Sequence, residues 1–419
     1  MRILVVSQYF WPENFRINDL CAELVSRGHE VTALTGKPNY PDGEVFSNFR
    51  SNPDAFNEYE GCQVVRVPMV ARGKGSSVKL LMNYFSYFVS ASLVGSWKLR
   101  GRLFDVIFVF EPSPVTVCLP AIFLKKLKKA PVVFWVLDLW PETLEAVGVV
   151  KSKAILALVG SLVAFIYNRC DLVLGQSKAF YDGIANYCTD KTKIKYFPSW
   201  SESVFLDETA PTIAELNKCE GFFKILFAGN VGDAQDFQSI LQAAKILKAK
   251  QIKTKFFIVG DGRAYEWVKS EISKQNLENY IHLLGRHPLE LMPSFYSSAD
   301  ALLVTLQESP VFAMTIPGKV QSYMAAGKPI LTMLSGEGSR IIDEAGCGYT
   351  AKSGDYEQLS GNIIAMSELN RDELVELGDN AKLYAQTEFN RDKLISQLEE
   401  WFVELCEKKQ NKNAVRKQF

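Results

Sequence analysis

Histidine and paired cysteines are scarce in this sequence of 419 residues. It contains three histidines, His29, His282 and His287, and its eight cysteines form no C-x-x-C pair. Ligand clusters for zinc or another transition metal are therefore hard to assemble, and we expect no metal and no cofactor. Scattered cysteines favour reduced thiols in a reducing compartment over disulfides.

Net charge and long apolar runs are missing as well. The 47 basic side chains balance 47 acidic ones, so no overall positive field indicates a nucleic-acid partner. The apolar segment 154–167 has about 14 residues, fewer than the roughly 20 that a membrane-spanning helix needs. No signal peptide precedes the first strand-like run, ILVVS, so we expect a cytoplasmic protein and interpret 154–167 as a core or interfacial helix.

Strand-like and helix-like segments alternate along the whole chain, which predicts an α/β fold with doubly wound parallel sheets. Strands are expected at 3–7, 31–35, 64–67, 106–110, 132–137, 172–176 and 194–196, and in a second series at 224–228, 256–259, 281–284, 301–306 and 330–333. One long helix is expected at about 78–99 and a last one at about 391–407, followed by a disordered tail. We predict two Rossmann-like domains, 1–198 and 223–387, which face a central cleft and are joined by a polar linker, 199–222.

A lysine occupies the first turn of a short helix predicted within TIPGKVQSYMAAGKPI, residues 315–330. Pro317 suits the start of this helix and Gly327 its end. The charge of Lys319 opposes the helix dipole there, at a cost of about 0.3 to 1 kcal/mol, unless an anion binds at the helix start. Lys319 is therefore either a solvated side chain or a phosphate contact.

Two glycine-containing loops follow strands of the second series. One comprises Gly229, Asn230, Val231 and Gly232, and the other comprises Gly260, Asp261, Gly262 and Arg263. Each is consistent with a simple tight turn, and Arg263 with a surface pair to Glu266. Glycine also lets backbone amides approach a phosphate closely. Since strand ends of a parallel sheet share one edge, we expect both loops and Lys319 to converge in a nucleotide-diphosphate pocket.

In the first half, the loop YFWPENFR leads from the first strand to a helix. This loop offers three candidates for binding an anionic acceptor substrate or a donor phosphate, namely Asn14, Phe15 and Arg16. The alternative is that Asn14 caps the loop and that Arg16 is exposed. Asp138 leaves the strand VVFWVL at the same sheet edge. It is a candidate catalytic base or sugar-hydroxyl ligand, or else the cap of the following turn.

Basic residues alternate with aromatic and aliphatic ones in two segments, 74–102 and 123–129. Such a mixture suits an anionic membrane surface, although much of the apolar part fits a helix core equally well. We expect peripheral contact with an anionic membrane surface.

Several spaced motifs together resemble the GT-B glycosyltransferases of the family-4 type: SQYFWPEN, GHEVTALTGKPNYPDG, DLWPE, FAGNVGDAQD, VGDGR and IPGKVQSYMAAGKP. More narrowly, the chain resembles bacterial O-antigen and capsule transferases, in particular N-acetyl-L-fucosamine transferases. The resemblance implies two Rossmann-like domains, with a C-terminal helix at about 388–407 that returns to the first. It also implies metal-independent, retaining transfer from a UDP-sugar, bound mainly by the second domain, to a polyprenyl-diphosphate-linked acceptor at the inner face of the bacterial plasma membrane.

The donor pocket departs from the broad family. Where that family often carries two glutamates, this chain has Met314 and Ser322, and Gln235 replaces a usual lysine. We expect Lys319 and Arg263 to supply the positive charge and Glu308 a sugar contact. The complete set of expected donor contacts is Gly229, Asn230, Gly232, Gln235, Gly260, Asp261, Gly262, Arg263, Glu308, Pro317, Lys319 and Ser322.

Two other functions share this architecture. One is an enzyme like the UDP-N-acetylglucosamine 2-epimerases, which needs no acceptor. The other is a nucleotide-sugar-binding partner without activity, since the glutamate pair is missing. The donor sugar itself is not specified by residue spacing.

Overall fold

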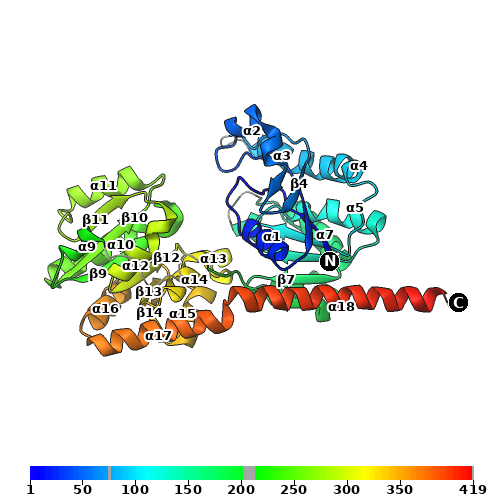
Figure 1. Ribbon diagram of the computed structural model, residues 1–419. Coiled ribbons are helices and arrows are strands. Elements are labelled where there is room, and N and C mark those ends of the chain that lie inside the picture. Colours follow the sequence, from blue (N-terminus) through cyan, green and yellow to red (C-terminus); the bar gives the residue numbers. More distant parts are fainter. Residues whose placement is uncertain (74–76, 147, 149, 202–212, 418–419) are drawn as a thin grey trace. The chain divides into compact units, whose positions relative to one another are not determined.

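The computed structural model describes residues 1–419 except 74–76, 147, 149, 202–212 and 418–419 (Figure 1). The chain divides into two compact units. Unit 1 comprises Met1–Phe197 with Asp392–Phe419, and unit 2 comprises Pro198–Arg391. Residues 202–212 of the predicted linker fall outside the described residues, and its later part contains a short helix, α9 (Ala214–Asn217).

Unit 1 is built on an eight-stranded sheet with the order β3-β4-β2-β1-β5-β6-β7-β8. All neighbouring strands are parallel except the pair of β3 and β4. The strands are β1 (Arg2–Val6), β2 (Glu30–Thr35), β3 (Glu58–Tyr59), β4 (Cys62–Arg66), β5 (Val106–Glu111), β6 (Val132–Val136), β7 (Leu172–Gly175) and β8 (Ile194–Tyr196). The central strands are buried on both faces, which explains their unbroken apolar runs.

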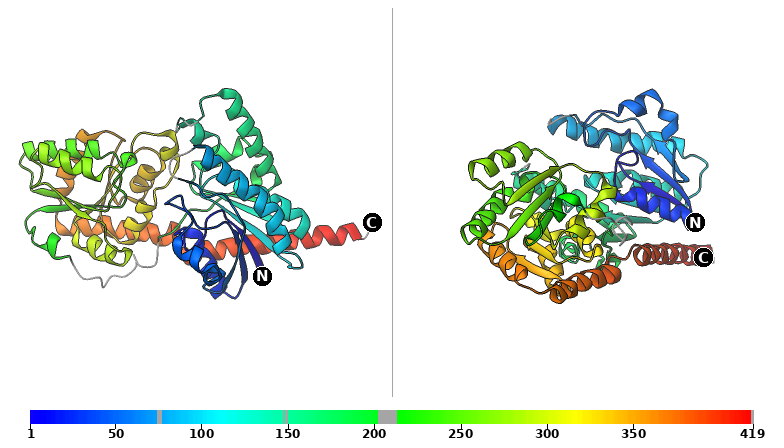
Figure 2. Two further views of the ribbon diagram at one scale, coloured as in Figure 1. Left: turned by 90° about the horizontal axis from the view of Figure 1, so that it is seen from above. Right: turned by 60° about the vertical axis from the view of Figure 1, so that its left-hand side comes forward.

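Helices cover both faces of this sheet (Figures 1 and 2). They are α1 (Arg16–Ser26), α2 (Ser47–Ser51), α3 (Ser77–Ser90), α4 (Ser96–Lys98), α5 (Cys118–Lys128), α6 (Glu142–Ala146), α7 (Lys153–Arg169), α8 (Phe180–Ala185) and α18 (Arg391–Lys417), with short turns η1 (Pro53–Phe56), η3 (Val115–Val117) and η4 (Lys191–Lys193). The helix predicted as continuous at 78–99 is interrupted by a π-helical turn, η2 (Ala91–Gly95). Within the described residues, no helix is long and apolar enough to cross a membrane.

The last helix, α18, completes the core of unit 1. The ring centroids of Phe402 and of Phe108 in β5 are 6.0 Å apart. Glu399 pairs with both Arg27, at 2.8 Å, and His29, at 2.6 Å. The helix continues to Lys417, so the expected disorder after residue 408 is wrong.

Unit 2 contains a six-stranded sheet with the order β11-β10-β9-β12-β13-β14, in which all pairs are parallel. The strands are β9 (Phe223–Ala228), β10 (Thr254–Val259), β11 (Ile281–Gly285), β12 (Ala301–Thr305), β13 (Ile330–Met333) and β14 (Gly348–Ala351). Along β9, Ile225 and Phe227 belong to one hydrophobic cluster and Leu226 and Ala228 to another. The sheet therefore has a separate core on each face.

The helices of unit 2 supply the other half of each core (Figure 2). They are α9, α10 (Phe237–Ala249), α11 (Tyr265–Lys274), α12 (Met292–Ser298), α13 (Pro310–Met314), α14 (Gly318–Ala325), α15 (Glu337–Ala345), α16 (Tyr356–Ser367) and α17 (Arg371–Glu388), with turns η6 (Asp233–Gln235) and η7 (Leu289–Leu291). The prediction of two doubly wound parallel sheets is confirmed.

The strand order identifies where each unit can bind a ligand. In unit 1, β1 lies between β2 and β5, and in unit 2, β9 lies between β10 and β12. At such reversals the connecting loops diverge and leave a crevice at the carboxyl ends of the strands. The loops after β1 and β9 are therefore the first places to look for a site.

Candidate functional site

The two glycine loops of unit 2 pack directly on each other. The backbone N–H of Val231 donates to the Asp261 carbonyl at 2.9 Å, and that of Gly229 donates to the Val259 carbonyl at 2.8 Å. A Cβ at Gly260, whose φ is +143°, would overlap the Gly229 carbonyl oxygen. The packing of the loops thus accounts for glycine at this position whether or not a ligand binds.

Replacing Gly260 by alanine is therefore expected to destabilise unit 2 by about 2 kcal/mol or more, because both the φ angle and the Gly229 carbonyl oppose a side chain. Gly361→Ala provides the matched control, since a Cβ at Gly361 in α16 meets nothing within 4 Å. It should be neutral or stabilise by about 0.5 to 1 kcal/mol. Urea unfolding of both variants checks the prediction, and equal stabilities would contradict it.

Lys319 lies in the first turn of α14 and points back to the Gly229 loop. An added Cβ at Gly229 would lie 2.5 Å from the Lys319 Cε and 2.9 Å from its Nζ. The Nζ lies 3.5 Å from the centroid of the Phe227 ring and, among the described residues, has no hydrogen-bond partner. Burial lowers the pKa of this amine to about 7. The interpretation of Lys319 as a solvated side chain is therefore wrong.

An unpaired amine in an apolar setting is costly, and the facing Phe227 ring offsets only part of the cost. An anion beside the Gly229 loop would restore a partner to the amine and favour its charged form. These contacts place Lys319 against the Gly229 loop, on which the Gly260 loop packs. The binding role of Lys319 stays a prediction.

The other expected donor residues lie around this centre in different ways. The side chain of Asn230 donates to Gln235 Oε1 at 3.3 Å, and both belong to the loop after β9. Arg263 is exposed, and Glu308 is exposed and accepts from the Ser335 hydroxyl at 3.1 Å.

Three further positions belong to the short segment around α14. Pro317 immediately precedes the helix, and Ser322 uses its hydroxyl within the helix, donating to the Gly318 carbonyl at 3.2 Å. Met314 ends α13. The Ser322 hydroxyl already bonds to its own helix, so Ser322 is a poor substitute for the glutamate of the broad family. Donor binding would then depend more on the positive charge of Lys319.

Asp138 follows β6 in unit 1. Its carboxylate accepts a hydrogen bond from the Trp140 indole at 3.1 Å and another from the Thr143 hydroxyl. The predicted role as cap of the following turn is supported only in part, because the carboxylate holds that turn through two side chains and accepts from no backbone N–H among the described residues. The Asp138 side chain is half-buried, so part of it is still accessible to a substrate. Its alternative role as a catalytic base or sugar-hydroxyl ligand stays a prediction.

Glu111 is not among the site residues predicted from the sequence, and it lies beside Asp138. It is the last residue of β5 and is fully buried. Its Oε2 accepts from the backbone N–H groups of Leu137 and Asp138, both at 3.3 Å. Burial, with Asp138 adding to it, raises the pKa of Glu111 well above its usual range. The available signal was a carboxylate at the end of the apolar run VIFVFE.

Glu13 is a second carboxylate that was not selected, although it lies within the loop after β1. It accepts from the backbone N–H groups of Phe10 at 3.1 Å, Asn39 at 2.7 Å and Tyr40 at 2.8 Å. Burial raises its pKa to about 7, while these three donors act in the opposite direction. Glu13 therefore ties the loop after β1 to the loop after β2.

The predicted acceptor residues lie on that loop. Asn14 is exposed and does not cap α1, since Phe15 precedes the helix without any side-chain cap bond, so the capping interpretation is wrong. The ring of Phe15 stacks on Tyr9 with centroids 5.6 Å apart, and Arg16 is the first residue of α1. Across the described residues, no group of three or more His, Cys, Asp or Glu side chains could hold a metal ion.

Two parallel-sheet α/β units, the second with a glycine loop pair beside a buried lysine, have the architecture of the GT-B fold. Residues 14–200 match the family described as glycosyl transferase 4-like domain, and residues 210–384 match glycosyl transferases group 1. The chain thus carries a glycosyl transferase 4-like domain followed by a glycosyl transferases group 1 domain.

Two relatives are described as glycosyltransferases, and a solved structure shares the fold. The probable glycosyltransferase WbjE of Pseudomonas aeruginosa is 31% identical over 246 residues, which span 56% of this chain and 60% of that protein. The putative colanic acid biosynthesis glycosyl transferase WcaI of Escherichia coli is 24% identical over 341 residues, 78% of this chain and 82% of WcaI. The structure of Anabaena HepE in complex with UDP and glucose covers 96% of this chain and 99% of its own, with a TM-score of 0.67 at 15% identity.

Proposed function

We propose that this protein is a retaining, metal-independent glycosyltransferase that uses a UDP-sugar as donor. The acceptor is a saccharide linked to a lipid diphosphate in O-antigen or capsule biosynthesis, and the sugar is N-acetyl-L-fucosamine. The observation that carries the proposal is the buried, unpaired amine of Lys319 against the Gly229 loop. HepE, which has the same fold, was crystallised with UDP and with UDP-glucose. The choice of sugar rests on the sequence resemblance alone.

The chemical task of such a site is to stabilise negative charge that grows on the departing diphosphate. Lys319 and the backbone amides of the loop after β9 are positioned donors in a partly water-excluded place, where such interactions are strong. Attack from the face that the diphosphate leaves requires no protein nucleophile. Asp138 then has the role of orienting the acceptor hydroxyl in unit 1.

Donor affinity should depend on pH through Lys319. Its pKa of about 7 in the free protein lies below the ordinary 10.5, and a bound diphosphate raises it again. Binding above about pH 7 must therefore take up a proton, and UDP affinity is expected to fall as the pH rises, by at most about tenfold per unit. Calorimetry in two buffers of different ionisation enthalpy measures the uptake. Binding without proton uptake at pH 8 would contradict a contact to this amine.

The function is tested with a panel of UDP-sugars and a synthetic polyprenyl-diphosphate disaccharide. The expected result is transfer of one sugar with retained anomeric configuration, unaffected by a chelator. A reaction without acceptor is the control. A changed sugar configuration there would support the epimerase alternative, and inertness with every donor and acceptor would contradict the proposed transfer.

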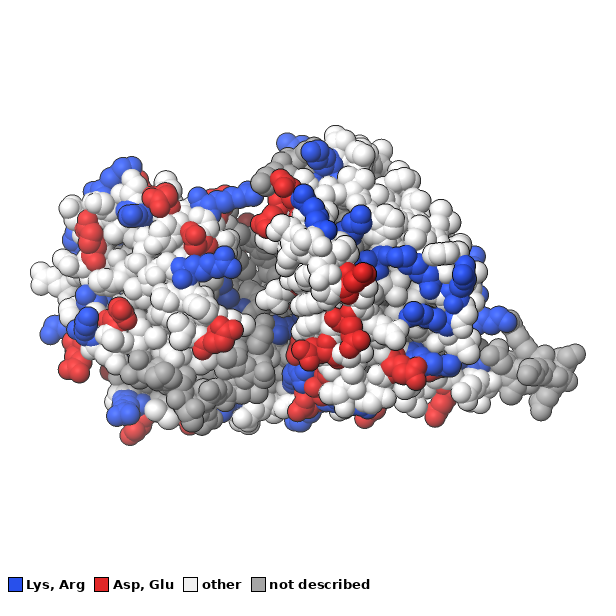
Figure 3. Space-filling model, turned by 45° about the horizontal axis from the view of Figure 1, so that its top comes forward, with Lys and Arg blue, Asp and Glu red and all other residues white. Residues whose placement is uncertain are grey.

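We also propose that unit 1 binds the inner membrane surface, where a lipid-linked acceptor resides. Large apolar side chains are exposed on α3, α4 and α7, including Leu81, Phe85, Trp97 and Leu158. In Figure 3, lysine and arginine side chains gather on the side of unit 1 that carries α4 and α5. A mixed apolar and basic surface of this kind suits anionic headgroups.

Replacing both Leu81 and Phe85 by serine is expected to reduce binding to phosphatidylglycerol vesicles by about tenfold, since both side chains are more than half exposed and little folding energy depends on them. Leu383→Ser, at an equally exposed position on α17 in unit 2, is the control. Vesicle sedimentation measures the effect. Equal losses in both variants would argue against a surface formed by α3.

A further inference from the structure

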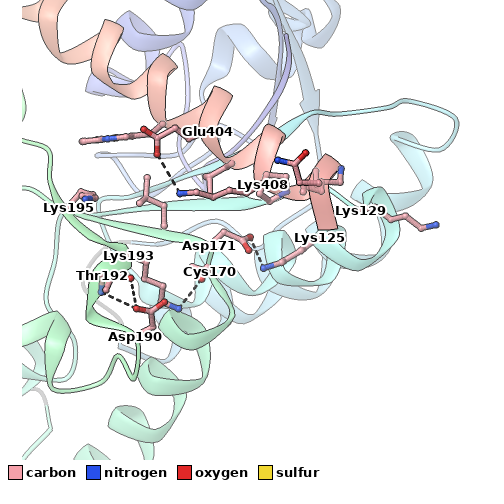
Figure 4. A pocket seen from close by; sticks show the side chains of 17 residues that line it. Lys125, Lys129, Cys170, Asp171, Asp190, Thr192, Lys193, Lys195, Glu404 and Lys408 are labelled. Atoms are coloured by element: carbon pink, nitrogen blue, oxygen red, sulfur yellow. Dashed lines mark hydrogen bonds and ion pairs between the residues drawn. The ribbon is translucent and has the colours of Figure 1, made fainter. Parts of the chain in front are cut away.

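A hollow lies in unit 1 at the amino ends of the strands, away from all of the loops described above. Its volume is about 1220 Å³. The walls are formed by the end of α5, by the residues that precede β6, β7 and β8, and by one face of α18 (Figure 4). The Asp138 loop leaves the opposite, carboxyl edge of the same sheet, so neither the donor nor the acceptor residues have a part in this hollow.

The hollow carries an excess of positive charge. Six lysines line it, Lys125, Lys129, Lys193, Lys195, Lys408 and Lys409, and they face three carboxylates, Asp171, Asp190 and Glu404. All three carboxylates already have partners. Asp171 pairs with Lys125 at 2.6 Å, Glu404 with Lys408 at 3.6 Å, and Asp190 accepts from the Thr192 hydroxyl at 2.6 Å. No acid in the wall is left over for the remaining lysines.

Three of the six lysines, Lys125, Lys193 and Lys408, bond to groups of the protein itself. Lys125 donates to the Arg169 carbonyl at the end of α7, at 2.7 Å, and Lys193 donates to the Cys170 carbonyl at 3.0 Å. Such contacts to helix ends are ordinary capping. In contrast, Lys129, Lys195 and Lys409 have no carboxylate within ion-pair distance among the described residues, and they come from three different elements.

The arrangement of these charges limits what can bind. In Figure 4 the labelled lysines are distributed along the hollow and do not converge on one point, with Lys195 and Lys129 near opposite ends. A single phosphate would reach only some of them, whereas an extended anion can contact several. A flat bilayer does not fit into a concave site lined by α18. The chemistry is that of charge-assisted bonds to phosphate oxygens.

We propose that this hollow binds a soluble oligophosphate anion with three or more phosphate groups. The anion joins Lys195 at β8 to Lys409 on α18 and so fastens the last helix to the sheet of unit 1. The site is independent of the proposed transfer reaction, and it can be present in the protein whatever the donor and acceptor are.

The test uses inorganic tripolyphosphate and the full-length protein at low salt. Calorimetry is expected to show binding that weakens by about tenfold or more in the triple variant Lys129→Gln, Lys195→Gln, Lys409→Gln. The control, Lys250→Gln, Lys253→Gln, Lys269→Gln, removes three exposed lysines of unit 2 and should bind like the wild type. Any binding at the donor loops is common to all three proteins and cancels in the comparison.

Two further measurements separate the proposal from simple loss of structure or charge. Glu404→Gln should bind tripolyphosphate more tightly, a result that a misfolded protein cannot give. Hydrogen exchange of the α18 amides should slow on adding tripolyphosphate to the wild type and not to the triple variant. Equal affinities of the wild type and the triple variant would overturn the proposal. So would a triple variant that loses only vesicle binding, which would assign these lysines to lipid headgroups.

Discussion

Lys319→Met is expected to weaken UDP binding by roughly 10- to 100-fold while the free energy of unfolding stays the same or increases. Methionine keeps the apolar stem that lies against the Phe227 ring and removes only the amine. A lost bond to a charged group is worth about 1.5 to 3 kcal/mol, which sets the change in affinity. Turnover should fall by about 10²- to 10³-fold, since the same charge stabilises the leaving diphosphate.

The gain in unfolding free energy expected for Lys319→Met depends on pH and should be largest near pH 7 and below. The pKa of Lys319 is about 7 when folded and 10.5 ordinarily, so between these values the unfolded chain binds more protons than the folded one. The contribution of Lys319 to stability therefore rises with pH across this window and is least favourable near pH 7 and below. Lys319→Met should abolish that slope. Urea unfolding at about pH 7 and at about pH 9 measures it.

Lys328→Met is a matched control from the same segment. The Lys328 Nζ donates to the carbonyls of Ser297 and Ala299, each at 2.9 Å. Its removal should lower stability and leave UDP affinity unchanged, the reverse of the pattern expected for Lys319. If both variants lost donor affinity in proportion to stability, the direct contact of Lys319 with the diphosphate would be refuted.

Asp138→Asn is expected to lower turnover by about 10²-fold or more with little change in UDP affinity. The substitution keeps an oxygen for one capping bond and removes the negative charge that would orient or deprotonate the acceptor hydroxyl. Steady-state kinetics with the lipid-linked acceptor, together with UDP calorimetry, measures the two effects separately.

Thr143→Val isolates the capping role, because it removes the hydroxyl that donates to Asp138 and leaves the carboxylate in place. Its turnover should remain near that of the wild type. If Thr143→Val and Asp138→Asn lost activity and stability to the same extent, Asp138 would be a structural cap and would leave the site.

The sequence was most informative where burial on both faces leaves a strong local pattern. The strands β5 and β6, in which every residue is buried, and β1, in which only Arg2 is not, carry apolar runs that predict them. The two-residue β3 and the partly exposed β14 have no apolar run to mark them. Pro317 and Gly327 likewise marked the limits of α14. Helix limits marked by proline and glycine can be predicted from neighbouring residues alone.

The site was harder to predict because its energetics depend on partners far along the chain. The burial of Lys319 in α14 depends on Phe227 in β9, which is distant in the sequence. Glu13 and Glu111 were overlooked because their donors are backbone N–H groups of Asn39 and Leu137, and any residue type can supply such a group. The basic hollow combines α5, β8 and α18, and its lysines are ordinary surface residues in the sequence.

The return of α18 to unit 1 has a consequence for biosynthesis. Unit 2 occupies an unbroken stretch, Pro198–Arg391, and has all its own strands once that stretch has left the ribosome. The sheet of unit 1 is synthesised first. Phe108 in that sheet packs against Phe402, which is synthesised only after the whole of unit 2. Nascent unit 1 thus exposes apolar surface throughout the synthesis of unit 2, and a chain that stops before α18 is a natural substrate for chaperones and proteases.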